Sequence, residues 1–276
     1  MTTTNKQFAA NVIAHSIGPA RRALCTMQVT FPRIILAEMN THRKFSRNAA
    51  SSRAIPIAKM VEEVRTNLFI PEFGSHKPGM QAGELVADQE IARLEWIAAS
   101  KDAVDSALAL HNLGVAKQVV NRLLEPFSWT TVIITSTSWA NFFDQRCSEF
   151  AQPEMRTIAE MMRLAYNHSI PTEFNDGDWH LPYVASSELE DIGLEKAMKA
   201  STARCSRVSY RHQDDSIDLD KDIRSFDKLS TSGHYSPFEH QAESNCHAGQ
   251  NMNGNLGYGW LQHRKIYPQE YIEDLA

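Results

Sequence analysis

The chain has 276 residues and a formal net charge of -5. The stretch between Met39 and Val61 holds no acidic residue and five Lys or Arg residues, so it carries +5 and leaves -10 for the remainder. General nucleic-acid-binding proteins usually spread basic charge over a broad surface, so this pattern argues against that class. It favours one focused anion site, with a solvated basic loop as the alternative.

The composition, 42% hydrophobic and 22% charged, is typical of a globular protein and excludes disorder. No apolar run approaches the ~20 residues that span a bilayer, and the N-terminus lacks a signal-peptide pattern. The four cysteines are widely spaced, which favours reduced thiols and no metal site. We therefore expect one cytoplasmic domain over residues 1–276, with no membrane or nucleic-acid partner.

In chain order, the first strong element begins at Leu24, where apolar and polar residues alternate with the period of a strand. Pro32 ends that strand, and residues 33–39 continue as an apolar helical turn. We predict a helix over 57–66. The proline and glycine residues of 71–79 predict an exposed loop.

The longest helical pattern covers residues 88–113. Its apolar residues recur at spacings compatible with one buried stripe, namely Ile91, Leu94, Ile97, Val104, Leu108 and Leu110. A second helix is expected over 115–124, ending before Pro126. The β-branched run 130–135 predicts a buried strand.

Residues 138–167 are predicted to be helical, with Ser138 as the N-cap and a bend or interruption at Pro153. A turn follows at 175–178. Three further helices are expected, over 189–198, around 202–210 and over 218–232. The fold class predicted is α+β, a helix-rich single domain with a small, mainly antiparallel sheet.

The basic segment 41–53 interleaves cations, hydroxyls and an amide. Arginine offers a planar fork of donors to phosphate oxygens, and serine hydroxyls and free backbone N–H groups complete an anion site. A second segment places Asn141 and Gln145 on one helix face beside Arg146, although an exposed arginine on such a helix is usually only solvated. The third, Ser236 to His240, fits a helix cap and turn as well as a site.

Together these segments resemble the flavin-dependent thymidylate synthases. That family's signature is Arg-His-Arg, then Ser, Asn-Glu, Ser and Arg; here Thr41-His42-Arg43 precedes Ser46, Asn48, Ser51 and Arg53 at the same spacing. The family's Asn-Phe-Leu-x-Leu-Arg and Ala-Gln-x-Glu segments resemble residues 141–146 and 151–154. Its Ala-Arg-Val-Ser-Tyr and Thr-Pro-Phe-Glu-His motifs resemble residues 206–210 and 236–240.

The order of these motifs differs from the family, in which the last two come first. A circular permutation explains this, with the family's N-terminal motifs relocated to about 200–245 and the old ends joined within 167–199. It requires residues 242–244 to lie close to 21–26, and permutation is tolerated where termini meet at the surface. The tail beyond Cys246 is expected to add a strand or hairpin.

The resemblance implies an enzyme that makes thymidylate from deoxyuridylate, so the expected partner is a pyrimidine deoxynucleoside monophosphate. Methylenetetrahydrofolate would supply one carbon, and FAD reduced by NADPH would supply a hydride. No cysteine nucleophile is needed, and none with an obvious base partner occurs in the sequence. The resemblance also implies a homotetramer with shared active sites.

The family's functional positions map onto two sets of residues. The cofactor-binding set is His42, Arg43, Lys44, Asn48, Asn141, Ser209, Ser236 and Glu239. The substrate-binding set is Glu38, Thr41, Ser51, Ser52, Arg53, Arg122 and Arg146. Within this set, the resemblance implies that Ser51, Ser52 and Arg53 form a loop that holds the nucleotide phosphate and that Arg122 is a second phosphate-binding arginine. Arg146 is also the catalytic candidate, because the resemblance places it at the pyrimidine carbonyl, where it would stabilise negative charge as C5 becomes nucleophilic.

Three positions depart from the family pattern. Thr41 replaces the first Arg of the signature, Ala49 replaces Glu, and Glu38 replaces Gln. These changes motivate the hypothesis of altered chemistry, such as C5 hydroxymethylation or a cytosine nucleotide as substrate. A non-catalytic flavin- or nucleotide-binding protein is the alternative from another class, and the retained arginines at 53, 122 and 146 argue against it.

Overall fold

The computed structural model describes residues 7–79, 81–208 and 218–267. Its central sheet has the strand order β3-β4-β2-β1-β5, and its pairs are antiparallel except β1 with β5. The strands are β1 (Ala9–Ile17), β2 (Ala23–Pro32), β3 (Ser46–Ala49), β4 (Trp129–Ser136) and β5 (Thr172–Glu173). A second, antiparallel sheet contains β6 (Trp179–His180), β7 (Ala242–Asn245) and β8 (Gly259–Gln262). The α+β class and the mainly antiparallel pairing are confirmed, while the second sheet extends the prediction.

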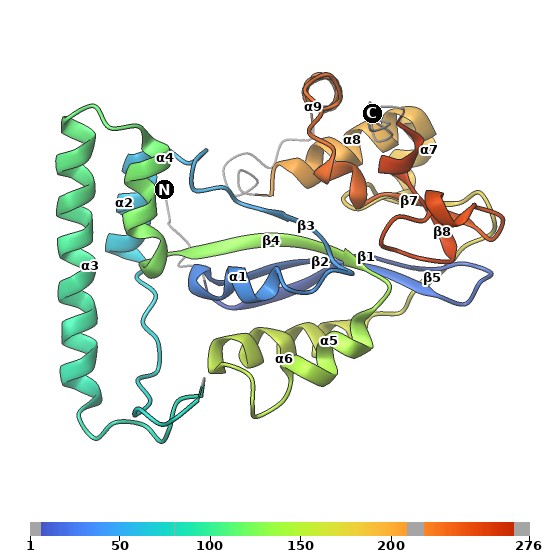
Figure 1. Cartoon of the computed structure of the whole chain (residues 1–276). Helices are drawn as coiled ribbons and strands as arrows, with labels where there is room; N and C mark the ends of the chain where they lie inside the picture. The colour runs from blue at the N-terminus through green and yellow to red at the C-terminus, as the bar shows by residue number, and fades with distance from the viewer. Residues whose placement is uncertain (1–6, 80, 209–217, 268–276) are drawn as a thin grey trace, which may run out of the picture.

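Helices stand at one end of the central sheet, and further helices lie on both of its sides (Figure 1). The α-helices are α1 (Leu36–Met39), α2 (Ile57–Thr66), α3 (Gln89–Asn112), α4 (Lys117–Val120), α5 (Trp139–Arg146), α6 (Pro153–His168), α7 (Ser186–Ile192), α8 (Leu194–Ser206) and α9 (Leu219–Thr231). Of these, α2, α3 and α4 stand at the end of the sheet, α5 and α6 lie on one side, and α7, α8 and α9 lie on the other. The 3₁₀ turns are η1 (Arg33–Ile35), η2 (Asn121–Phe127), η4 (Ser236–Glu239), η5 (Gln250–Met252) and η6 (His263–Ile266).

The core is layered on the two faces of the central sheet. Helices α5 and α6 lie against one face (Figure 1), where Phe142 and Met155 join Met27 and Ile134 in a buried cluster. On the other face, Ile133 of β4 packs against the end of α8. Strand residues that alternate between two buried faces explain why the run over 130–135 is apolar or β-branched throughout.

Several predicted elements are confirmed, and the strongest is α2, whose bounds match the prediction. β2 ends at Pro32 and continues into η1 and α1 as expected, and Pro153 begins α6. Proline suits the first position of a helix because its missing N–H would have no partner there. Ser138 is at the N-cap of α5, but its side chain makes no capping hydrogen bond.

Other predictions were wrong. Ile91 and Leu94 are 60% and 54% exposed, because the first part of α3 extends along one side of the molecule (Figure 1) and the packing centres on Val104 and Ala107. The helix expected over 115–124 is instead the short α4 followed by η2, which contains Pro126. The helix over 189–198 is divided at Gly193, whose positive φ of 76° suits glycine.

Residues 242–244 do lie beside 21–26, as the permutation requires. Leu24, Ala242 and Trp260 belong to one buried cluster, and the indole Nε1 of Trp260 donates to the carbonyl of Arg22 at 2.9 Å. β8 supplies the strand expected in the C-terminal tail. The permutation itself stays a prediction.

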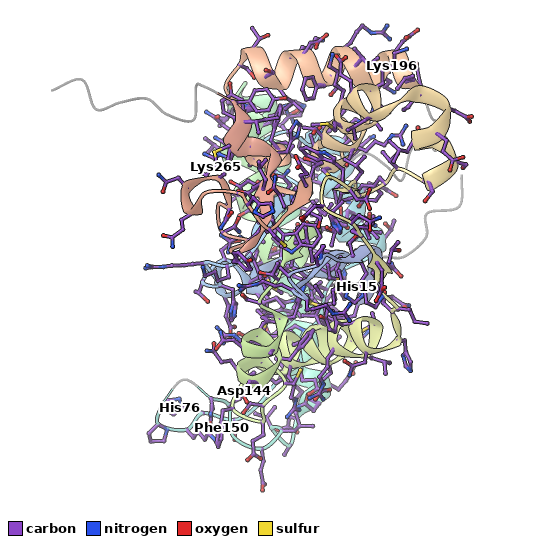
Figure 2. All side chains as sticks on the ribbon, turned by 90° about the vertical axis from the view of Figure 1, so that its right-hand side faces the viewer. His15, His76, Asp144, Phe150, Lys196 and Lys265 are labelled. Carbon is purple, nitrogen blue, oxygen red and sulfur yellow. The ribbon has the colours of Figure 1, made fainter. Side chains whose placement is uncertain are left out.

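The 71–79 loop is exposed over residues 76–79, as predicted, but Phe73 is partly buried and its ring centroid lies 6.3 Å from that of Trp96 on α3. The chain shortly after this loop reaches the connection between α5 and α6. His76 lies at the same end of the molecule as Asp144 and Phe150 (Figure 2), and Gln81 Nε2 donates to the Phe150 carbonyl at 3.4 Å. Among the described residues, no helix has both the length and the apolar character needed to cross a membrane.

Candidate functional site

The turn between α1 and β3 is fixed by an arginine that folds back on it. Arg47, in β3, donates to the backbone carbonyls of Asn40 at 2.7 Å and His42 at 3.2 Å. The last carbonyls of a helix have no partner within it, and a guanidinium has enough donors to satisfy several of them. Arg47 therefore fixes the backbone at the point where His42 projects.

His42 is buried against the aromatic residues of the core. Its ring meets Phe142 edge-on at a centroid distance of 4.9 Å and lies 5.5 Å from Phe45. Burial, together with the positive charges of Arg146 and Arg47, lowers the pKa of His42 to about 4. The imidazole is therefore neutral near pH 7, so one ring nitrogen is available as a hydrogen-bond acceptor.

Arg146, the last residue of α5, is held by three residues that are distant in sequence. Its Nε donates to Nε2 of His42 at 2.9 Å, one terminal nitrogen pairs with Oε1 of Glu38, and the other donates to Oγ1 of Thr41 at 3.3 Å. The fold thus brings four predicted site residues into direct contact. Two of them, Glu38 and Thr41, are positions at which the chain departs from the family pattern.

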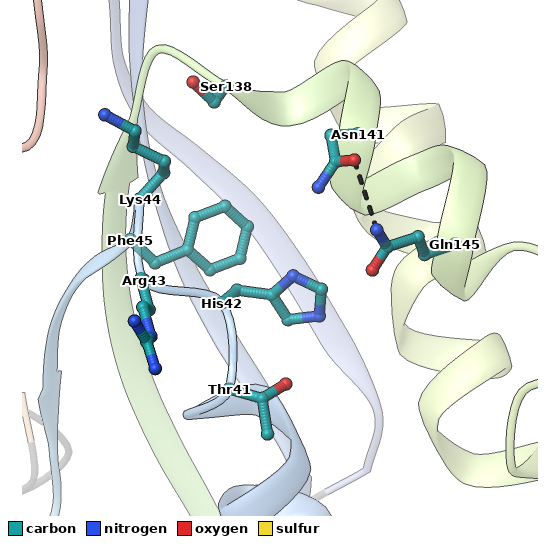
Figure 3. Close-up of a pocket in the computed structure, with 8 residues that line it drawn as sticks. All are labelled: Thr41, His42, Arg43, Lys44, Phe45, Ser138, Asn141 and Gln145. Atoms are coloured by element: carbon teal, nitrogen blue, oxygen red, sulfur yellow. Dashed lines mark hydrogen bonds between the residues drawn. The ribbon is translucent and has the colours of Figure 1, made fainter.

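A pocket of about 400 Å³ lies between the basic segment and α5 (Figure 3). Its lining contains five residues of the basic segment and three at the start and along the face of α5, namely Thr41, His42, Arg43, Lys44, Phe45, Ser138, Asn141 and Gln145. The amide of Gln145 donates to Oδ1 of Asn141 at 3.2 Å. Arg43 and Lys44 are exposed, and neither side chain has an acidic partner in the part of the chain that the structure describes.

Three predicted substrate-binding residues lie in the loop between β3 and α2, namely Ser51, Ser52 and Arg53. The buried Asn121 of η2 holds this loop, because its Nδ2 donates to the carbonyls of Ser52 at 2.7 Å and Ile55 at 2.9 Å. Arg122 follows Asn121, so the fold also brings the second predicted phosphate arginine to this loop. Arg53 is exposed and has no hydrogen bond or ion pair with any described residue.

The remaining cofactor-binding candidates lie on or beside β3. Asn48 is in β3, and its Nδ2 is buried with no hydrogen-bond partner among the described residues. The η4 turn, which holds Ser236 and Glu239, packs against β3, and Glu239 pairs with Arg264 of η6. Ser209 lies outside the described residues.

Other residues of the C-terminal segments stabilise the fold. Arg204, in α8, is buried and pairs with Glu188 and, at 2.8 Å, with Asp222. His240 is buried too, and its Nδ1 lies 2.8 Å from Oγ1 of Thr135 in the central sheet. These contacts fasten the C-terminal segments to each other and to the sheet.

Five polar residues help to shape the site but were not predicted to be binding or positioning residues. They are Arg33, Arg47, Asn121, Glu125 and Arg264. Glu125 follows Arg122 at the i,i+3 spacing that brings helical side chains together, and this was a usable signal. Arg47 lies in the basic segment that the sequence does mark, whereas local sequence carries no such signal for Arg33, Asn121 and Arg264. In the described part of the chain, no group of three or more His, Cys, Asp or Glu residues is arranged to hold a metal ion.

Two solved structures of a UMP/dUMP methylase, PolB from Streptomyces cacaoi, are similar to this chain. The structure bound with 5-Br UMP is 15% identical and has a TM-score of 0.46, covering 58% of this chain and 88% of its own. The structure bound with 5-Br dUMP is 14% identical with the same TM-score of 0.46, and the coverages are 59% and 91%. No curated protein sequence matched the chain.

A family model described as thymidylate synthase complementing protein matches residues 2–172. This range includes the basic segment, Arg122 and the whole of α5, and it is more than half of the chain. The chain therefore belongs to the Thy1 family, the flavin-dependent thymidylate synthases that its motifs resemble.

Proposed function

We propose that this chain is an enzyme that transfers a one-carbon unit from methylenetetrahydrofolate to C5 of a pyrimidine deoxynucleoside monophosphate, with FAD as cofactor and NADPH as reductant. The observation that carries the proposal is the position of Arg146. Thr41 and His42 contact its guanidinium and also line the pocket. Arg146 therefore lies at the edge of a pocket that contains cations and amides.

Arg146 would act by electrostatic stabilisation. A guanidinium directed at a pyrimidine carbonyl stabilises the negative charge that builds on the ring as C5 becomes nucleophilic. The neutral His42 accepts the hydrogen bond from Nε and so orients the guanidinium without adding a second positive charge. The contacts of Glu38 and Thr41 restrict the other end of the same group, which reduces the reorganisation needed during reaction.

The residues of the pocket have the chemical groups needed to bind FAD. Arg43 and Lys44, which have no acidic partner among the described residues, would hold its pyrophosphate, since cations form charge-assisted hydrogen bonds with phosphate oxygens. Asn141 lines the same pocket, and the buried Nδ2 of Asn48 is a donor that needs an acceptor. When bound, FAD supplies the hydride for the new C5 substituent, and the chain's residues bind and orient the reactants.

Glu38 favours a related alternative, in which the substrate is a cytosine nucleotide or the product is hydroxymethylated. Its Oε1 is engaged by Arg146, whereas no described residue donates to Oε2. A carboxylate oxygen accepts from an exocyclic amine, while the glutamine of the family pattern can donate as well as accept. Replacing glutamine by Glu38 therefore changes which hydrogen-bonding groups of a pyrimidine the pocket can pair with.

We further infer that the C-terminal segments complete the same site, as a circular permutation of the family order implies. The support is the packing of η4 against β3, beside the cofactor-binding candidates on that strand. The assembly that we propose remains a homotetramer with shared sites.

The flavin pocket can be tested with a visible absorbance spectrum. We expect purified protein supplied with FAD to bind it and turn yellow, and the double variant Arg43→Ala/Lys44→Ala to bind FAD at least ~10-fold more weakly, because charge-assisted hydrogen bonds are lost. Lys101→Ala removes an exposed lysine on α3 and should leave FAD binding unchanged. Wild-type affinity in the double variant would show that FAD is not held in this pocket.

A further inference from the structure

An acidic side chain lies among the groups that we propose to bind the nucleotide phosphate. One nitrogen of Arg122 donates to both carboxylate oxygens of Glu125, at 2.9 and 3.1 Å. The Nε of Arg33 lies 3.1 Å from Glu125 Oε1, and Ser52 is also a neighbour of this carboxylate. Glu125 therefore occupies the kind of position, between two guanidinium groups and beside a hydroxyl, that a bound phosphate would use.

These residues form a hydrogen-bonded cluster that is open to solvent on one side. The Arg33 side chain is only 9% exposed, and it also donates to the carbonyl of Ala50 at 3.0 Å. The Arg122 side chain, by contrast, is 57% exposed. An incoming anion can therefore reach Arg122 from solvent. Arg33 remains on the inner side of the cluster, where it is hydrogen-bonded to the loop between β3 and α2.

Glu125 is an ionised anion in this cluster. Burial works to raise the pKa of Glu125, but hydrogen bonds and positive charge from neighbours that include Arg122 and Arg33 outweigh it and lower the pKa. A phosphate that engages Arg122 would lie within a few ångströms of this carboxylate, and like charges at such distances repel strongly. Because Glu125 already holds one terminal nitrogen of Arg122, a phosphate that engages both terminal nitrogens must displace the carboxylate.

We propose that the carboxylate of Glu125 occupies the phosphate site when no ligand is bound. The nucleotide phosphate must displace this carboxylate from Arg122. Arg33 retains Glu125 after displacement. Arg122 can then turn to the phosphate, together with Arg53, which has no partner among the described residues. Glu125 thereby lowers the affinity for phosphorylated ligands and keeps Arg33 and Arg122 paired when no ligand is bound. This inference rests on the proposed function, because it takes the ligand to be a nucleoside monophosphate.

Calorimetric titration of Glu125→Gln with deoxyuridylate, deoxyuridine and inorganic phosphate tests the proposal. At fixed ionic strength, we expect deoxyuridylate and inorganic phosphate to bind ~10-fold more tightly than to wild type, because the competing charge is gone. Deoxyuridine, which lacks the phosphate, should bind with unchanged affinity. Glu62→Gln, which removes an exposed acid of α2, is the matched control and should change none of the three.

Unchanged or weaker phosphate binding by folded Glu125→Gln would overturn the proposal and leave Glu125 as a support for Arg122 and Arg33. Glu125→Asp keeps the charge but withdraws it from Arg122, so it should give a smaller gain and decides the matter if the glutamine variant does not fold. If wild type binds neither nucleotide nor nucleoside, the proposed function fails. The inorganic phosphate comparison then still decides the role of Glu125.

Discussion

Replacing Arg146 by alanine is expected to lower kcat by ~100-fold or more, as removal of a single transition-state hydrogen-bond donor does in other enzymes. The fold should survive, because the side chain of its ion-pair partner Glu38 is 27% exposed and can be solvated by water. FAD should remain bound, since Arg43, Lys44 and Asn141 are untouched. Because the interaction strengthens only as charge develops, kcat should fall more than KM rises. Steady-state kinetics and the flavin spectrum measure these effects.

Two further variants sharpen the test of Arg146. Arg146→Lys keeps the charge but loses the fork that contacts His42 and Thr41, so it should recover only part of the activity. Arg163→Ala removes an exposed arginine of α6 and should behave as wild type. Turnover of Arg146→Ala near the wild-type rate would refute the catalytic role, and loss of FAD together with activity would reassign Arg146 to cofactor binding.

Acid is expected to unfold this protein sharply, because four histidines are buried in neutral form. Burial is the largest cause of a lowered pKa for each, to about 4 for His42 and about 3 for His180, His240 and His263. As pH falls below 6.5, the unfolded chain binds protons at these residues and the folded chain does not, so the free energy of unfolding decreases. Each unmatched proton costs about 1.4 kcal/mol per pH unit.

Together the four histidines would remove roughly 5 kcal/mol of stability per pH unit once the unfolded chain is fully protonated. A typical domain has only about 5–15 kcal/mol to lose, so we expect unfolding between about pH 6 and pH 4. Denaturant midpoints measured across this range test the expectation. The slope of the free energy of unfolding against pH should fall in His240→Gln by the contribution of about one proton. His76→Gln, in the exposed loop (Figure 2), should leave this slope unchanged. A flat stability profile between pH 6.5 and pH 4.5 would contradict it.

The sequence predicts elements best where one local pattern is sufficient. The alternation in β2 and the β-branched run of β4 each determine the local structure. β1 was not predicted, since its residues are only partly buried and it is defined by pairing with β2. The apolar stripe of α3 was wrongly predicted to be buried along its whole length. Helical periodicity shows which residues share a face but not whether another element covers that face. Ile91 and Leu94 illustrate this limit.

The candidate site was predictable residue by residue but not as a geometry. Motif spacing marks Arg146, His42, Thr41 and Glu38, yet only the central sheet and α5 bring the first of these against the other three. Glu38 was expected to face the substrate, and its ion pair with Arg146 adds a second role. Contacts between side chains so far apart in the chain depend on the tertiary fold, which no local pattern encodes.

The most direct test of the proposed one-carbon transfer is mass spectrometry of the products. The flavin-loaded protein, methylenetetrahydrofolate and NADPH would be incubated with deoxyuridylate and deoxycytidylate in separate reactions. We expect one of the two nucleotides to gain a methyl or hydroxymethyl group at C5. Ordinary conversion of deoxyuridylate to thymidylate would establish the synthase reaction and exclude the altered chemistry inferred from Glu38 and Thr41. Recovery of both nucleotides unchanged from flavin-loaded protein would contradict the proposed function.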